Sequence, residues 1–191
     1  MIDTLEIRMI LTTYKWSLEE WHDLVNSGVL AGKKVELLEG EIVTMSPEGI
    51  PHRNTNHKAV KYLRKLLDGL AEVYESHPVT LDNSEPEPDI AIVRLPETIY
   101  DRHHPYPEDI YWLVEISYES LLKDLEQKTI TYARNGVAEY WVINLKSNQL
   151  IVHTQPQGDR YTQITQYQKT DRITSLAFPK INIALDRLLL Y

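Results

Sequence analysis

Two charged side chains, Glu115 and Lys128, occupy positions that their neighbours mark as buried. Glu115 lies within the apolar run YWLVEI, which has the composition of a buried strand. Lys128 lies in segment 120–135, whose apolar residues recur at helical spacing. At about 100° per residue, Lys128 falls inside the apolar stripe of this helix. A buried lysine needs a carboxylate partner, because desolvation otherwise favours its neutral form. We therefore expect a tight strand-to-helix connection to bring the two side chains together.

A second carboxylate, Asp89, follows Pro88 at the start of the apolar run DIAIV. Two carboxylates on neighbouring strands with a lysine beside them are suited to Mg²⁺ or Mn²⁺, which also bind water and substrate phosphate oxygens. Such a metal would polarise a phosphate and activate a water molecule. Lys128 would orient that water or stabilise developing charge. The structural alternatives are a turn aspartate at position 89 and a Glu–Lys pair that only solubilises a face.

Glu36 and His52 are secondary candidates. Glu36 lies in an expected hairpin, where it would either add an acid beside the metal or form a surface charge. His52 follows the segment MSPEGIP, and it would either contact phosphate and relay a proton or lie on a surface loop. Asp124 lies one helical turn before Lys128, which favours an ion pair between them that supports the helix.

Capping and turn residues predict the elements that position these side chains. Ser17 and Glu20 form a capping box that opens a short helix ending near Gly28. Glu39-Gly40 predicts the turn of a hairpin over residues 34–45. We expect further helices over 54–70 and 120–135, strands over 79–81, 89–94, 110–117, 138–144, 150–154 and 160–167, a surface loop over 97–109, and a short strand and helical turn over 178–191.

This order of helices and strands predicts an α/β or α+β fold, with a mixed central β-sheet flanked by helices. The 191 residues are expected to form one domain, 1–191, with residues 1–15 as an N-terminal extension.

Composition excludes several classes of protein. The chain has no cysteine, which excludes disulfides and thiolate metal sites. It has no apolar run long enough for a transmembrane helix, and its N-terminus does not have the pattern of a signal peptide. We therefore expect a cytoplasmic protein without a membrane partner. The net charge of −8 disfavours a DNA-coating role, yet it is compatible with an enzyme that contacts nucleic acid locally through a metal ion.

Several motifs together resemble one bacterial family, described as putative restriction endonucleases. These motifs are Pro88-Asp89, VEIS at a strand end, the helix with Lys128, and NGVAEYWVIN. The segment VELLEGEIVTMSPEG followed by His52 is similar to the N-terminal signature of that family. The resemblance extends from about Trp16 to INIALDRLL. It implies a restriction-endonuclease-like fold and a single PD-(D/E)xK nuclease-like domain.

The resemblance also implies a function and a set of site residues. The function would be that of a Mg²⁺- or Mn²⁺-dependent endodeoxyribonuclease that hydrolyses phosphodiester bonds with an activated water. Asp89, Glu115 and the backbone carbonyl of Ile116 would bind the metal. The nuclease motif has a lysine two residues after the glutamate, where Ser117 stands in this chain. Lys128 would supply the missing amine.

Two other functions are compatible with the same residues. The acidic composition and the displaced lysine favour a catalytically silent nuclease-fold module with an interaction or regulatory role. The apolar terminal segment ALDRLLLY favours a dimerising scaffold. A homodimer would also be favoured if the nuclease cuts both strands of a duplex, since one such site cuts one strand.

Overall fold

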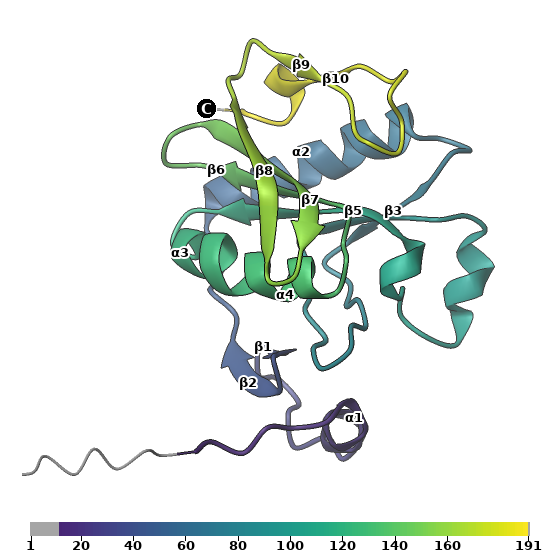
Figure 1. The fold of residues 1–191 in the computed structure, drawn as a ribbon, viewed down its shortest axis with the longest axis vertical. Coiled ribbons are helices and arrows are strands. Elements are labelled where there is room, and N and C mark those ends of the chain that lie inside the picture. The colour runs from purple at the N-terminus through teal and green to yellow at the C-terminus, as the bar shows by residue number, and fades with distance from the viewer. Residues whose placement is uncertain (1–11, 191) are drawn as a thin grey trace, which may run out of the picture.

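The computed structural model describes residues 12–190, and its centre is a six-stranded mixed sheet (Figure 1). Residues 1–11 of the expected N-terminal extension lie outside the described residues. The strand order is β3-β4-β5-β6-β7-β8, and only β5 and β6 run parallel. The strands are β3 (Glu72–Glu75), β4 (Ile90–Val93), β5 (Ile110–Ser117), β6 (Glu139–Asn144), β7 (Gln149–Gln157) and β8 (Arg160–Tyr167). The predicted mixed sheet with flanking helices is confirmed.

Helices cover both faces of this sheet (Figure 1). The α2 helix (Ile50–Leu66) lies on one face. A continuous helical crossover lies on the other, and it consists of α3 (Leu121–Lys123), a π-helical turn η3 (Asp124–Lys128) and α4 (Thr129–Arg134). Because the crossover joins the parallel strands β5 and β6, it packs directly over the end of β5. This connection places Lys128 above Glu115.

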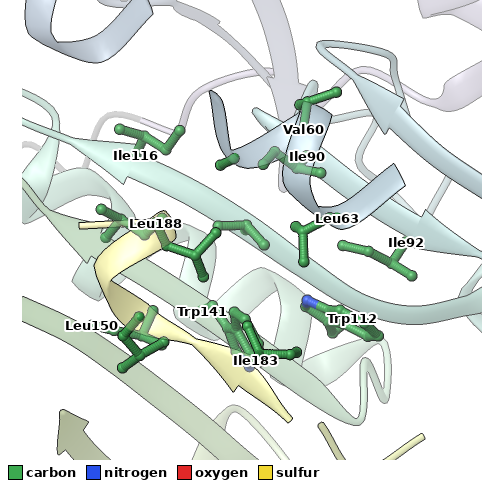
Figure 2. Close-up of a cluster of buried hydrophobic side chains, with 14 of the residues drawn as sticks. Val60, Leu63, Ile90, Ile92, Trp112, Ile116, Trp141, Leu150, Ile183 and Leu188 are labelled. Carbon is green, nitrogen blue, oxygen red and sulfur yellow. The ribbon is translucent and has the colours of Figure 1, made fainter. Parts of the chain in front are cut away.

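Alternate side chains of β5 enter two separate hydrophobic clusters, as the pleat of a strand requires. Trp112 lies in the cluster that contains Val60 and Leu63 of α2 (Figure 2), and Val114 belongs to the same cluster. Leu113 lies in the opposite cluster, beneath α4. Glu115 continues the second series, so its carboxylate points toward the crossover helix.

The N-terminal helix α1 (Leu18–Asn26) and the hairpin of β1 (Val35–Leu38) and β2 (Glu41–Thr44) lie on the same side of the sheet as the crossover (Figure 1). The Ser17 hydroxyl accepts from the Glu20 N–H, and the Glu20 carboxylate accepts from the Ser17 N–H, which confirms the predicted capping box. The hairpin turn is also confirmed.

The turn places both central residues in the left-handed region. Glu39 has φ 49° and Gly40 has φ 73°. This conformation matches the right-handed twist of a two-residue hairpin. A Cβ on Gly40 would also lie 3.0 Å from the Lys15 Cβ and 3.1 Å from the Trp16 carbonyl oxygen. Glycine therefore allows the chain preceding α1 to approach the hairpin closely.

Three elements differ from the predictions. The strand expected over 79–81 is absent, and that segment is a loop. In this loop the Val79 N–H donates to the Pro86 carbonyl and the Leu81 N–H donates to the Ser84 carbonyl, and the edge strand of the sheet is instead β3. The α2 helix begins at Ile50, before the predicted start, because a proline is well tolerated in a first turn. The segment 97–109 contains two short 3₁₀ helices, η1 (Glu97–Asp101) and η2 (Pro107–Asp109).

The last part of the described chain covers the α2 side of the sheet. It contains the short strands β9 (Arg172–Ile173) and β10 (Ile183–Ala184) and the 3₁₀ helix η4 (Leu185–Arg187). Its apolar side chains join the cluster that contains α2. Among residues 12–190, none of the helices combines the length and apolar character needed to cross a bilayer.

Truncating α2 on its buried face tests this packing. Leu63 is 1% exposed, so Leu63→Ala should lower the free energy of unfolding by about 2–5 kcal/mol, measured by urea denaturation. Leu122 is 69% exposed, so Leu122→Ala should change it by less than about 0.5 kcal/mol. Equal losses for the two variants would contradict this arrangement of the core.

Candidate active site

A pocket of about 300 Å³ opens where the hairpin, the first turn of α2, the start of β4 and the end of β5 meet the crossover helix. All five sequence-predicted side chains line it: Glu36, His52, Asp89, Glu115 and Lys128. The tertiary structure therefore brings together residues from five separate segments of the chain. The predicted proximity of Glu115 and Lys128 is confirmed by their contact.

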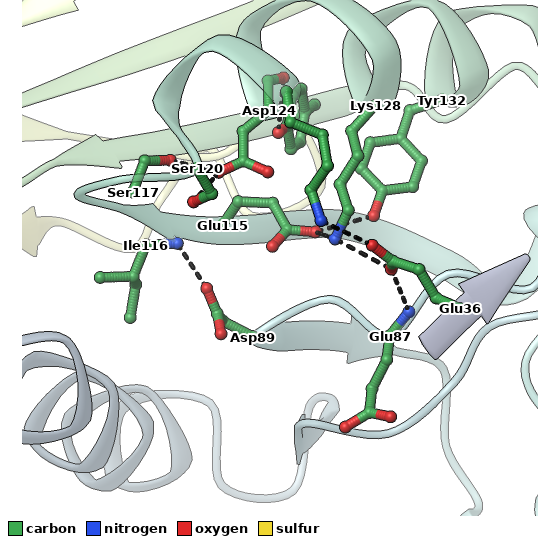
Figure 3. Close-up of polar contacts among 12 residues, drawn as sticks. Glu36, Glu87, Asp89, Glu115, Ile116, Ser117, Ser120, Asp124, Lys128 and Tyr132 are labelled. Atoms are coloured by element: carbon green, nitrogen blue, oxygen red, sulfur yellow. Dashed lines mark hydrogen bonds and ion pairs between the residues drawn. The ribbon is translucent and has the colours of Figure 1, made fainter. Parts of the chain in front are cut away.

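The Lys128 ammonium lies between two buried carboxylates (Figure 3). Its Nζ donates to Glu115 Oε1 at 2.7 Å and lies 3.2 Å from Glu36 Oε2. The Tyr132 hydroxyl also donates to Glu115 Oε1, at 2.9 Å. Lys128 is 3% exposed and Glu115 is 4% exposed, so water contributes little to their solvation. The ion pair and the tyrosine thus replace the hydration that both charges lose on burial.

Glu36 is the second partner of Lys128 and is itself buried. Its Oε1 accepts from Lys123 Nζ at 2.9 Å, and its Oε2 accepts from the Glu87 backbone N–H at 3.1 Å. Burial opposes ionisation, yet Lys128 and Lys123 together lower the pKa of Glu36 below its usual value. Glu36 therefore ties the hairpin to the crossover helix as an ionised group.

Asp89 lies directly before β4, and it lines the same pocket as Glu115. The register of β4 and β5 ends with the pair Ile90 and Val114, so Asp89 and Glu115 each lie directly beyond a residue of this last pair, in the direction of the pocket. Asp89 Oδ2 accepts from the Ile116 backbone N–H at 2.6 Å (Figure 3). The carbonyl of a strand residue points to the same side as its N–H, so the Ile116 carbonyl also faces the Asp89 side of β5.

The imidazole of His52, in the first turn of α2, holds the same aspartate oxygen. Its Nε2 lies 3.1 Å from Asp89 Oδ2. Although burial disfavours the charged ring, the hydrogen bond and negative charge of Asp89 raise the pKa of His52 above its usual value. His52 Nδ1 is buried without a hydrogen-bond partner among the described residues. The α2 helix is thereby joined to the pocket through a side chain that can carry a proton.

Asp124 does not form the predicted ion pair with Lys128. Its Oδ2 accepts from the Ser117 hydroxyl at 2.7 Å and from the Ser120 hydroxyl at 2.6 Å. The π-helical turn over Asp124–Lys128 is wider than an α-helical turn, so the two side chains do not have the usual offset of residues four apart. Ser117, which stands where the nuclease motif has lysine, thus anchors the start of the crossover.

Carboxylates outnumber the cations around Glu115. Burial raises the pKa of Glu115 well above its usual value, the Lys128 ammonium opposes this, and Asp124, Asp89 and Glu36 add repulsion. Burial also disfavours a charged Lys128, but the carboxylates of Glu115 and Glu36 raise the pKa of Lys128. The pocket therefore holds a charged lysine within an excess of carboxylate oxygen.

Most of the side-chain atoms around the pocket that could bind a metal are carboxylate oxygens, which suit hard cations such as Mg²⁺ and Mn²⁺. Within residues 12–190, no group of three or more His, Cys, Asp or Glu side chains is placed to hold a metal ion. A metal bound here would consequently depend on two carboxylates, a backbone carbonyl and water. Mg²⁺ is commonly bound in this way, since it keeps several waters and needs few protein ligands.

Lys123 was not among the predicted site residues. Its helical phase places it away from the apolar stripe, as for a solvated lysine. Its contact with Glu36 joins residues 87 positions apart, which periodicity cannot reveal. His57 lies on the same helix as His52, but it is exposed and does not line the pocket.

Comparisons with known proteins agree with this fold. The sequence model of the Uma2 family, described as putative restriction endonuclease, matches residues 18–186. The chain belongs to the Uma2 family. This confirms the resemblance seen in its sequence motifs.

A crystal structure of a putative nuclease belonging to DUF820, from Anabaena variabilis ATCC 29413, is similar to the chain with a TM-score of 0.63. The match covers 82% of this chain and 89% of that protein. At 13% sequence identity, this likeness shows a shared fold. No curated protein matches the chain significantly.

Removing the lysine tests the buried ion-pair network. Lys128→Met should lower the free energy of unfolding by about 3–5 kcal/mol, because it leaves two buried carboxylates without their partner. Adding Glu115→Gln should recover part of that loss, which urea denaturation of the single and double variants measures. Lys146→Met, at an exposed pair with Glu119, should leave stability nearly unchanged. Strictly additive losses at positions 115 and 128 would contradict direct coupling.

Proposed function

We propose that the protein is a metal-dependent endonuclease that hydrolyses phosphodiester bonds of nucleic acid, with DNA as the substrate. The observation that carries this proposal is the placement of Asp89 and Glu115 in one pocket, where the adjoining strands β4 and β5 meet it, with the Lys128 ammonium 2.7 Å from Glu115. Membership of the Uma2 family supports the same function. A solvent-accessible pocket at this position gives a phosphodiester access to the carboxylates.

Asp89, Glu115 and the Ile116 carbonyl are the groups proposed to hold Mg²⁺ or Mn²⁺. The excess of carboxylates around Glu115 favours a divalent cation, which would offset their repulsion. When bound, such an ion supplies Lewis acidity toward a phosphate oxygen and lowers the pKa of a coordinated water.

The other side chains of the pocket would orient these groups. The Ile116 N–H and His52 fix the direction of the Asp89 carboxylate, while Lys128 and Tyr132 fix that of Glu115. Such restraint lowers the reorganisation needed when substrate binds. Lys128 would stabilise negative charge that develops beside Glu115, and His52 would contact phosphate or transfer a proton.

Nuclease activity should depend on Asp89. Purified protein with Mg²⁺ or Mn²⁺ should nick supercoiled plasmid DNA, and Asp89→Ala should lower the rate by roughly 100-fold or more, since a ligand should matter at least as much as its supporting groups. Asp82→Ala removes an exposed aspartate from the preceding loop and should retain activity. If wild type and Asp89→Ala are equally inert on duplex DNA, single-stranded DNA and RNA, the nuclease proposal is wrong.

A catalytically silent nuclease-fold module is the second candidate function. Lys128 is engaged by both Glu36 and Glu115, and Ser117 occupies the usual lysine position. These contacts would equally suit a lysine that only stabilises the fold. Metal binding separates the two functions, because a silent module has no need of a metal site.

Titration calorimetry with Mn²⁺ should show binding to the wild-type protein. Glu115→Gln should weaken that binding at least about tenfold, because it removes a charged ligand while keeping the shape of the side chain. Glu126→Gln, a matched change at an exposed residue that does not line the pocket, should bind like wild type. Equal Mn²⁺ binding by wild type and Glu115→Gln, or no binding by either, would favour the silent module.

A further inference from the structure

The α2 helix carries a concentration of positive charge that the pocket does not explain. This 17-residue helix contains no Asp or Glu. Five of its exposed residues are basic: Arg53, Lys58, Lys61, Arg64 and Lys65. The whole chain has a net charge of −8, so this helix departs sharply from its surroundings. We call these five residues the α2 basic face.

The basic residues share one side of the helix. At about 100° per residue they fall within an arc of roughly 140°, opposite the side that contributes Ala59, Val60 and Leu63 to the core. The α2 basic face is therefore exposed to solvent on the side of the helix that does not pack on the sheet, and Arg64, at its margin, also bonds to Val73 of β3. Core packing accounts for the apolar side of the helix and leaves the charge on the other side unexplained.

Carboxylates do not neutralise the α2 basic face. None of its five residues forms an ion pair with a carboxylate among residues 12–190, whereas Lys15, Lys34 and Lys146 each pair with a glutamate. Arg64 makes one hydrogen bond, from Nε to the Val73 carbonyl. Unpaired like charges along one helix repel one another, so a polyanion laid along them would relieve an unfavourable interaction.

The α2 basic face begins at the pocket. Pro51 and His52, in the first turn of α2, line the pocket, and His52 contacts Asp89. Arg53 is the next residue and is exposed. The helix extends about 26 Å from this point, at about 1.5 Å per residue. Along a duplex, that length corresponds to roughly eight phosphates of one strand.

We infer that the α2 basic face binds the phosphate backbone of the nucleic acid whose scissile phosphate enters the pocket. The nature of the partner rests on the proposed nuclease function. Lysine and arginine side chains on one helix neutralise successive phosphates, and they do so without reading base sequence. An acidic enzyme thereby gains affinity for a long polyanion on one face only. The interaction positions the strand and tolerates unrelated sequences.

A charge-neutralising variant tests this inference. Lys58→Gln/Lys61→Gln/Lys65→Gln removes three exposed charges and spares Arg64, which bonds to β3. The matched control Lys15→Gln/Lys33→Gln/Arg160→Gln removes three exposed charges outside α2. Fluorescence anisotropy of a labelled 30-base-pair duplex, with full-length protein in EDTA, measures binding without cleavage. Potassium chloride is varied, and a second duplex of unrelated sequence is run in parallel.

The wild-type affinity should fall steeply with salt and be similar for both duplexes. The α2 variant should bind at least about tenfold more weakly at low salt. When the logarithm of its binding constant is plotted against the logarithm of the salt concentration, the slope should be shallower by about 2 to 3, since each phosphate contact contributes about 0.9. The control should retain most of the wild-type slope. The same dependence on α2 with RNA of equal length would also support a phosphate-binding face.

Three results would overturn the inference: no binding by wild type, equal weakening by the two triple variants, or α2-dependent binding to phosphatidylserine vesicles that duplex DNA does not compete away. Hydrolysis of bis(p-nitrophenyl) phosphate with Mn²⁺ separates this inference from the proposed function. That small substrate cannot reach along α2, so the α2 variant should hydrolyse it like wild type. Asp89→Ala should not hydrolyse it, even if its DNA binding is intact.

Discussion

The buried lysine is the constraint on which the arrangement of this protein depends. An ammonium group as enclosed as that of Lys128 costs several kcal/mol to desolvate, so the fold must surround it with carboxylates. Glu115 comes from the central sheet and Glu36 from the N-terminal hairpin. The ion pairs of Lys128 therefore join three parts of the chain: the crossover helix, the central sheet and the N-terminal hairpin. The hairpin holds its position over the sheet through ionic contacts as well as packing.

The parallel connection between β5 and β6 makes that arrangement possible. It places the crossover helix over the end of β5, and the π-helical turn lies where Asp124 and Lys128 diverge. Asp124 then binds two serines at the helix start, while Lys128 extends to the glutamates. π-Helical turns are frequent at functional sites, where they re-aim side chains at a cost in regular hydrogen bonding. Helical phase correctly predicted that Lys128 is buried. It predicted the wrong partner for Asp124, because the π-helical turn changes the offset between these two residues.

Charge is divided between the two sides of the sheet. The pocket lies on the crossover side and is rich in carboxylates, whereas the exposed surface of α2, on the other side, is basic. The first turn of α2 belongs to both regions, because His52 contacts Asp89 while Arg53 faces solvent. Under the proposed function, attraction for phosphate is confined to α2, whose first turn lines the pocket. Net charge summed over the chain conceals this division.

Local patterns in the sequence determined that Glu115 and Lys128 are buried, that the fold is a mixed sheet with flanking helices, and where the hairpin turns. These features depend on periodicity and on turn residues close together in the chain. Tertiary structure alone decided that Glu36 is the second partner of Lys128, that Lys123 reaches Glu36, and that His52 holds Asp89. Lys123 and Glu36 are 87 residues apart, and His52 and Asp89 are 37 apart. Contacts of this kind depend on how the chain folds back on itself and on which rotamers packing allows, and neither is encoded in local spacing.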